Sequence, residues 1–173
     1  MSEHRSLLMR ANRTLGAALV EANLVKIDDL MAANERLLEL LQSDAEHQAT
    51  LLGVLMFEKK VLGEADFLQY LIETAGIGLI DLRNYEVPEE FRKDVDLGSC
   101  WATWTVPFDK EEDFYFVASA YYLSTAVRSH WEKQLGGNIL WYGTTLEVVS
   151  DFLEKIGGSP AKAVEPAKVA KSA

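Results

Sequence analysis

The order of hydrophobic and polar residues in the first half of the chain is repeated once. Residues 15–30 and 52–67 align without a gap, and the identical positions are Leu15/Leu52, Gly16/Gly53, Glu21/Glu58 and Asp29/Asp66. Other positions keep an apolar side chain in both copies, namely Leu19/Met56, Val20/Phe57, Leu24/Val61, Val25/Leu62 and Leu30/Phe67. An internal repeat of this kind predicts one helix-turn-helix unit that is used twice.

Each copy carries the signals of a helix end. Asn23 and Lys60 fall where a helix often turns through a left-handed residue, a position that asparagine tolerates best after glycine. Gly16 and Gly53 lie inside the first helix of each copy, where glycine costs roughly 1 kcal/mol relative to alanine. We therefore expect a close approach to the backbone at both glycines, either by a packed helix or by a ligand.

The apolar spacing predicts helices over residues 5–22, 28–43, about 44–59 and 64–75. Ser43 and Asp44 are good capping residues for the third helix. Leucines on two neighbouring faces of the second helix predict that it is covered on two sides. Arg5, Arg10 and Arg13 make the exposed side of the first helix basic.

The pattern changes after residue 78. Short apolar or alternating runs predict strands at residues 79–82, 101–108, 114–118 and 139–142, and helical spacing predicts helices at 123–135 and 146–156. Pro88 indicates a further helix start within residues 87–91, and Thr144 and Thr145 are caps for the last helix. The expected class is therefore α+β, with a helical repeat subdomain over 1–78 and a ββαβα subdomain over 79–158. Residues 159–173 lack core-forming side chains, which predicts a disordered tail.

Charge, apolar run length and the cysteine and histidine content limit the classes of function that the chain can have. A net charge of −10 argues against binding nucleic acid or an anionic membrane through a broad basic face, so an anionic ligand would need a local cluster of cations. The apolar runs are too short for membrane insertion and the N-terminus lacks a signal peptide, which predicts a cytoplasmic location. The single cysteine, Cys100, is expected to be a buried apolar side chain beside Trp101. The histidines are scattered without further ligands at metal-site spacing, so no metal site is expected.

Trp101 and Trp104 are the candidates for a protein contact. They lie three residues apart, so in an extended strand their side chains point to opposite faces. One of the two rings is therefore expected to be exposed. An exposed tryptophan on a small domain is typical of a surface that binds another protein.

The motifs together resemble one protein family. The doubled Leu-Gly helix-turn-helix is followed by Ile80-Asp81-Leu82, by Tyr85-Glu86-Val87-Pro88-Glu89 and by a ββαβα unit that contains Val106-Pro107-Phe108. Over residues 12–156 this order is similar to the N-terminal domain of the type II secretion and type IV pilus assembly ATPases. There the domain precedes an ATPase and meets the inner-membrane platform. The sequence contains no Gly-x-x-x-x-Gly-Lys-Ser/Thr phosphate loop, so the resemblance implies a regulatory or docking domain standing alone without the ATPase core.

One branch of that family binds cyclic di-GMP through both repeats. Its motif has an arginine before the Leu-Gly, a glycine in the turn and a glutamine that closes the second helix. The corresponding residues here are Thr14, Leu51, Asn23, Lys60, Leu37 and Thr74, so all six positions depart from the motif. The resemblance gives as ligand-contact candidates Arg13, Leu15, Gly16, Leu19, Asn23, Gly53, Met56 and Lys60.

Two functions therefore compete. The first is a non-enzymatic adaptor that has no cofactor and docks on another cytoplasmic protein. The sequence identifies neither that partner nor the oligomeric state. The second is a receptor for a cyclic dinucleotide with degenerate binding motifs. An enzyme with an unrecognised site is a third and weaker hypothesis, because no nucleophile motif such as Gly-x-Ser-x-Gly occurs.

Overall fold

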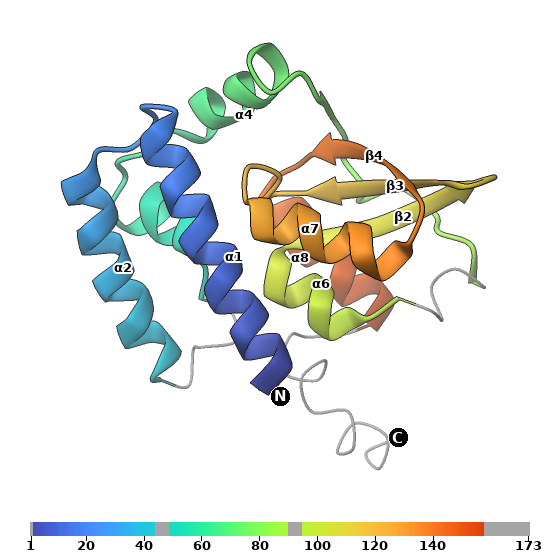
Figure 1. Ribbon diagram of the computed structural model, residues 1–173, viewed down its shortest axis with the longest axis horizontal. Coiled ribbons are helices and arrows are strands. Elements are labelled where there is room, and N and C mark those ends of the chain that lie inside the picture. The colour runs from blue at the N-terminus through green and yellow to red at the C-terminus, as the bar shows by residue number, and fades with distance from the viewer. Residues whose placement is uncertain (1, 44–48, 90–94, 158–173) are drawn as a thin grey trace.

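The first helix of the protein lies at the centre of its fold. The structure is a computed structural model that describes residues 2–43, 49–89 and 95–157. In the first half it places α1 (Ser2–Glu21), α2 (Ile27–Leu41), α3 (Leu51–Gly53), the π-helical turn η2 (Val54–Glu58) and α4 (Glu64–Glu73). Helix α1 lies between α2 on one side and the helices of the second half on the other (Figure 1).

The second half is a small mixed sheet with helices. Its elements are β1 (Gly78–Leu79), α6 (Leu97–Thr103), β2 (Thr105–Glu111), β3 (Phe114–Ser119), α7 (Thr125–Leu135), β4 (Asn138–Gly143) and α8 (Leu146–Gly157). The strand order is β1-β4-β3-β2, in which β2 and β3 form an antiparallel hairpin and the other pairs are parallel. The predicted α+β class and the ββαβα order of the second half are confirmed.

One apolar core runs through both halves. It includes Leu15 and Leu19 of α1, Leu55 of η2, Trp131 of α7 and Phe152 of α8. Helix α1 contacts α2 and α3 and also packs against α6 and α7. Because α1 contributes to both halves, the boundary drawn at residue 78 stays a prediction.

The repeat folds with the backbone geometry that its sequence predicts. Asn23 has φ 62° and Lys60 has φ 54°, so both turns pass through the left-handed region. A Cβ atom on Gly16 would lie 2.8 Å from Cδ1 of Leu30 and 3.3 Å from Cδ2 of Leu51. A packed helix, rather than a ligand, therefore accounts for Gly16.

The hydrogen bond that closes the turn after the first helix spans one residue more in the second copy than in the first. Leu24 N donates to Leu19 O over 2.9 Å, whereas the corresponding Val61 N donates to Leu55 O, also over 2.9 Å. The second bond spans one residue more because η2 is π-helical, and the backbone bonds of a π-helix reach five residues back instead of four. Leu55 therefore takes the position of Leu19, and the ungapped pairing of Leu19 with Met56 is corrected.

The start of the third helix also differs from the prediction. Helix α3 begins at Leu51, and Thr50 precedes it in an extended conformation, so the N-cap position of α3 is Thr50 and not Ser43. Residues 44–48 lie outside the described residues, as do residues 90 and 91 of the helix start predicted at 87–91 and the tail at 159–173.

The prediction of a strand over Trp101 and Trp104 is wrong. Asp96 caps a short helix here by accepting from Ser99 N over 3.3 Å, and Trp104 ends it in the left-handed region with φ 49°. The two indole rings pack edge to face, 5.5 Å apart, and are only 4% and 7% exposed. Neither ring is therefore the exposed protein contact that the sequence suggested. Cys100 of the same helix is completely buried, as expected.

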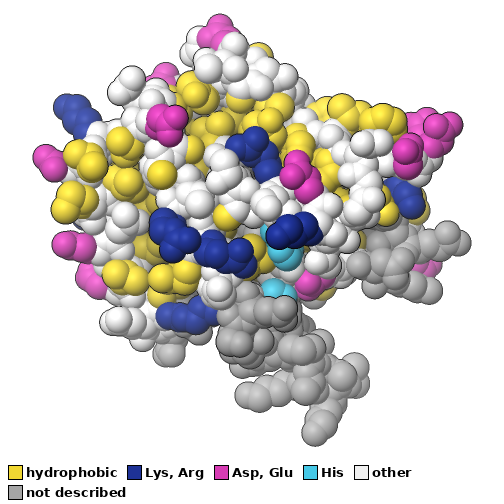
Figure 2. Space-filling model, in the orientation of Figure 1, with side chains coloured by type: hydrophobic (Ala, Val, Ile, Leu, Met, Phe, Trp, Pro, Cys, Tyr) yellow, Lys and Arg dark blue, Asp and Glu magenta, His cyan; other side chains and the backbone are white. Residues whose placement is uncertain are grey.

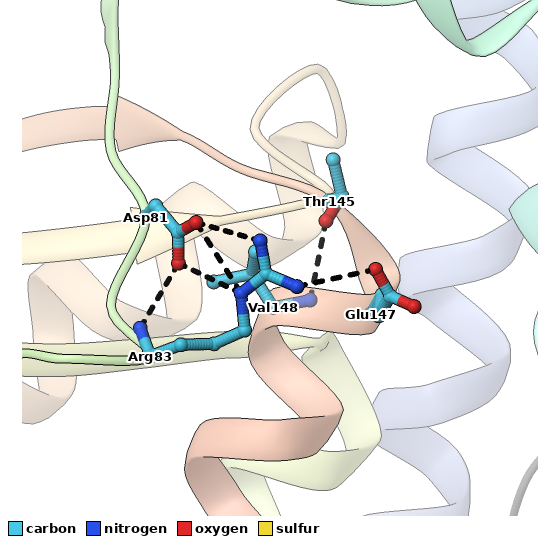
Figure 3. A network of polar contacts seen from close by, with 5 residues as sticks. All are labelled: Asp81, Arg83, Thr145, Glu147 and Val148. Atoms are coloured by element: carbon cyan, nitrogen blue, oxygen red, sulfur yellow. Dashed lines mark hydrogen bonds and ion pairs between the residues drawn. The ribbon is translucent and has the colours of Figure 1, made fainter.

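A polar network attaches the segment after β1 to the start of α8 (Figure 3). The guanidinium of Arg83 contacts Asp81 at 2.7 Å and Glu147 at 3.4 Å. Thr145 accepts from Val148 N over 3.1 Å, which confirms the cap predicted for the last helix. Hydrogen bonds from the side chain and backbone of Arg83 lower the pKa of Asp81 to about 2.

Candidate functional site

The ligand-contact candidates from the repeat do not form one exposed site. Leu15 and Leu19 are completely buried, Met56 is 8% exposed, and Gly16 is buried under Leu30, so these residues serve the core. Gly53 is half-buried, and a Cβ atom there would lie 3.6 Å from Leu146 of α8.

The polar candidates Arg13, Asn23 and Lys60 are exposed. Arg13 and Asn23 are ten residues apart, which corresponds to roughly 15 Å along a helix axis. Side chains at that separation do not converge on one phosphate group.

The positions where the cyclic-di-GMP branch has its arginines have structural roles in this chain. The Thr14 hydroxyl lies 2.5 Å from the Ser124 hydroxyl and accepts from Ala126 N over 3.4 Å, so it joins α1 to the start of α7. Leu51 is completely buried in the core. Leu37, at the first closing position, is 4% exposed. An arginine at position 51 would have to be buried within the core.

A groove between α1 and α2 is open on the surface of the protein. This α1–α2 groove has a volume of about 610 Å³ and is lined chiefly by apolar side chains, among them Met9, Ala17, Val20, Ile27 and Leu38. Ile27 and Leu38 remain 61% and 47% exposed, and Met31 of α2 is 60% exposed. Figure 2 shows hydrophobic side chains at the surface over these helices.

The exposure of Leu38 corrects the expectation that the second helix is covered on two sides. Leu37 and Leu41 of α2 face the core and are almost inaccessible, whereas Leu38 on the neighbouring face has no covering element among the described residues. The sequence signal was therefore real, because the second apolar face exists. No described part of the chain covers this face.

A second hollow lies between α1 and α7. This α1–α7 cleft has a volume of about 350 Å³ and is lined by Arg10, Ala126, Ser129, His130, Lys133 and Gln134. A smaller cavity of about 140 Å³ adjoins it and shares Arg10, His130 and Gln134 with it. The sequence indicated the basic side of α1, but it gave no sign that Lys133 and His130 lie opposite Arg10.

The described residues offer no metal centre and no membrane span. Among residues 2–43, 49–89 and 95–157, no group of three or more His, Cys, Asp or Glu side chains is arranged to hold a metal ion. No helix in the same ranges is long and apolar enough to cross a bilayer.

Two solved structures share the fold. The N-terminal domain of XpsE superposes with a TM-score of 0.55 at 18% sequence identity, covering 84% of this chain and 94% of that chain. MshE, solved with cdg, superposes with a TM-score of 0.52 at 17% identity, covering 82% of this chain and 97% of that chain. No protein-family profile and no curated protein sequence matches the chain. The chain therefore has the fold of the secretion-ATPase N-terminal domain, as the sequence resemblance implied.

Proposed function

We propose that the protein is a non-enzymatic adaptor or regulatory module that docks on another cytoplasmic protein of a secretion or pilus machine. The observation that carries this proposal is the α1–α2 groove, whose apolar side chains remain exposed. Single exposed apolar residues are ordinary, but a contiguous apolar hollow on a small domain is typical of a binding surface. The similarity to the N-terminal domain of XpsE supports the type of machine.

The shape and charge of the groove suit an amphipathic helix of the partner. The lining residues of α1 run from Met9 to Glu21, which is roughly 18 Å of helix and matches about three turns of a docked helix. Arg13 and Glu21 border the groove at separate points along α1. A partner helix with a carboxylate facing Arg13 and a cation facing Glu21 would bind in one direction only, because the reverse orientation places like charges together.

Cyclic-di-GMP binding is the alternative function. The fold shared with MshE, which was solved with cdg, favours it. The roles of Thr14 and Leu51 disfavour it, because a ligand with two phosphates must be met by cations or by converging backbone N–H groups. The adaptor therefore fits the described residues better.

The docking proposal can be tested at Ala17, an exposed residue that lines the groove. A photo-crosslinking amino acid at position 17 of the full chain, in the cells that produce it, is expected to capture one protein. That protein would then be purified and titrated against the unmodified chain, Ala17→Arg and Ala65→Arg. Ala65 is an exposed alanine on α4 and provides a matched control.

The expected result is that Ala17→Arg weakens binding at least tenfold, because it places a charge in the apolar groove, while Ala65→Arg has no effect. Equal weakening by both variants, or no crosslink at position 17, would show that the groove is not the docking surface.

A further inference from the structure

Positive charge gathers on the face of the protein where α1 and α7 lie (Figure 2). Between residues 4 and 20 the first helix has three arginines and no carboxylate, although the whole chain has a net charge of −10. Figure 2 shows a row of Lys and Arg side chains on the face where α1 and α7 lie, with histidine beside it. The α1–α7 cleft lies between these two helices, with Arg10 on α1 and Lys133 on α7.

The two permanent cations of the cleft have no anionic partner among residues 2–43, 49–89 and 95–157. In the described part of the chain, neither the Arg10 guanidinium nor the Lys133 ammonium makes an ion pair. Other exposed arginines of the same chain are paired, as Arg36 is with Glu58 at 2.8 Å and Arg83 is with Asp81 at 2.7 Å. The cleft therefore holds two cations whose charge is available to a ligand.

The nearest lining carboxylate is already engaged. Asp96 lines the smaller adjoining cavity, lies 3.6 Å from His4 Nε2 and accepts from the Ser99 hydroxyl over 2.6 Å. Burial raises the pKa of Asp96, but the hydrogen bonds from Ser99 and the contact with His4 outweigh it and leave the pKa below its ordinary value. Asp96 therefore stays ionised, which favours an anion in the larger cavity, away from this carboxylate.

The donors around the cleft are those that recognise a phosphate group. A guanidinium offers paired N–H donors that match phosphate oxygens, and a lysine adds a point charge. Ser129 and Gln134 contribute a hydroxyl and an amide that can donate to further oxygens. The volume of about 350 Å³ falls in the range of small-molecule sites.

We propose that the α1–α7 cleft binds the phosphate group of a small soluble ligand. This site is separate from the α1–α2 groove, so it stands or falls independently of the proposed docking function. Arg10 and Lys133 supply the charge, and Ser129 and Gln134 supply orientation.

In the test, the full chain is titrated with sodium pyrophosphate as the probe, and the amide chemical shifts are measured by NMR. Sodium chloride at the same ionic strength is the reference titration. Pyrophosphate is expected to give saturable shifts in the amides of residues 129–134 and around Arg10. Lys133→Gln is expected to weaken binding about tenfold or more, as loss of a charge-assisted bond would. Lys155→Gln is the matched control, because both lysines are exposed and lie in the last turn of their helices.

Three outcomes would overturn the proposal. The first is a set of amide chemical-shift changes that do not saturate or that sodium chloride reproduces, because such changes report general screening of charge and not binding. The second is equal weakening by Lys133→Gln and Lys155→Gln. The third is binding of a single-stranded oligonucleotide or of anionic phospholipid vesicles through the cleft amides without any response to pyrophosphate, which makes the cleft part of a macromolecular or membrane contact. Saturable binding by the unmodified chain that also weakens in Arg10→Gln supports the proposal even if one variant folds poorly.

Discussion

The hydroxyl of Tyr121 donates a 2.5 Å hydrogen bond to Oδ1 of Asn12, and this bond joins the end of the β-hairpin to the first helix. Asn12 Oδ1 also accepts from Leu51 N over 3.0 Å, and the Tyr121 hydroxyl contacts the hydroxyl of Thr50. Tyr121 is completely buried, which raises the pKa of its phenol. One buried polar cluster therefore fixes three segments that are far apart in the sequence.

Tyr121→Phe is expected to destabilise the protein by about 1–3 kcal/mol. The substitution keeps the ring but removes the hydroxyl, so Thr50 and Asn12 lose a buried partner. Denaturant unfolding of both proteins gives the difference in the free energy of unfolding. Tyr70 of α4 is half-buried, and its hydroxyl makes no hydrogen bond in the described part of the chain, so Tyr70→Phe should change the free energy of unfolding by no more than about 0.5 kcal/mol. A Tyr121→Phe protein as stable as the Tyr70→Phe protein would contradict the role assigned to the cluster.

Gly16→Leu is expected to cost on the order of 1–3 kcal/mol through overpacking against Leu30 and Leu51. Gly16→Ala should remain within about 1 kcal/mol of the unmodified protein, because the better helix propensity of alanine offsets a small shift of the flexible Leu30 side chain. Thermal or denaturant unfolding measures both variants. Ala65→Leu on the exposed side of α4 controls for the added volume. Unchanged stability in Gly16→Leu would mean that this face of α1 is not packed.

Asp81 is expected to titrate near pH 2 because of its bonds to Arg83. Its pKa in the folded protein is below the ordinary value of 3.8, so its contribution to stability is complete above about pH 4 and is lost as the pH falls through about 2. Both side chains are exposed, and solvent screening keeps that contribution small. The Asp81 carboxyl resonance followed by NMR should return toward pH 3.8 in Arg83→Gln and stay unchanged in Arg36→Gln. Titration near 3.8 in the unmodified protein would refute the pairing.

Cys100 is expected to be inert in the folded protein. Burial raises the pKa of its thiol, so both access and ionisation oppose reaction. A thiol reagent such as DTNB should react with the folded chain at least on the order of a hundredfold more slowly than with the chain in denaturant, because reaction requires opening of α6. Comparable rates in the two conditions would place the thiol at the surface and contradict the packing of α6.

Cyclic di-GMP is expected to bind weakly or not at all. Loss of one charged hydrogen-bond donor costs roughly 1.5–3 kcal/mol, so the replacement of two arginines weakens binding by a factor on the order of a hundred or more. Calorimetric titration of the unmodified chain measures this directly. A dissociation constant at or below about 1 μM that Arg13→Ala or Lys60→Ala abolishes would favour the receptor function over the adaptor.

Local chemistry explains why the repeat was predictable. Asn23 and Lys60 adopt the left-handed conformation because a helix end has few ways to turn, and those ways favour particular residues nearby in the sequence. The α+β class followed from the change of apolar period after residue 78, which is also a local signal.

Short apolar runs were ambiguous because their local signal does not separate a helix from a strand. Residues 97–103 have too few positions for a period to separate a helix from a strand, and the tryptophans favoured the strand. Asp96, with Ser99 three residues later, was the available signal for a helix start, because an aspartate at that position can accept from the backbone N–H of Ser99. The π-turn at η2 left no trace in the ungapped repeat, since it changes the hydrogen-bond register and not the order of apolar residues.

The sequence by itself determined the repeat turns, the need for a close approach at Gly16, the strand and helix order after residue 104 and the basic side of the first helix. Only the tertiary structure decided where those features meet. Arg10 and Lys133 are separated by more than a hundred residues, and their shared cleft exists because α7 crosses from β3 to β4 and packs against α1. The sequence also left the groove beside α2 undecided, because an apolar helix face predicts burial and only the packing shows whether the chain itself buries that face.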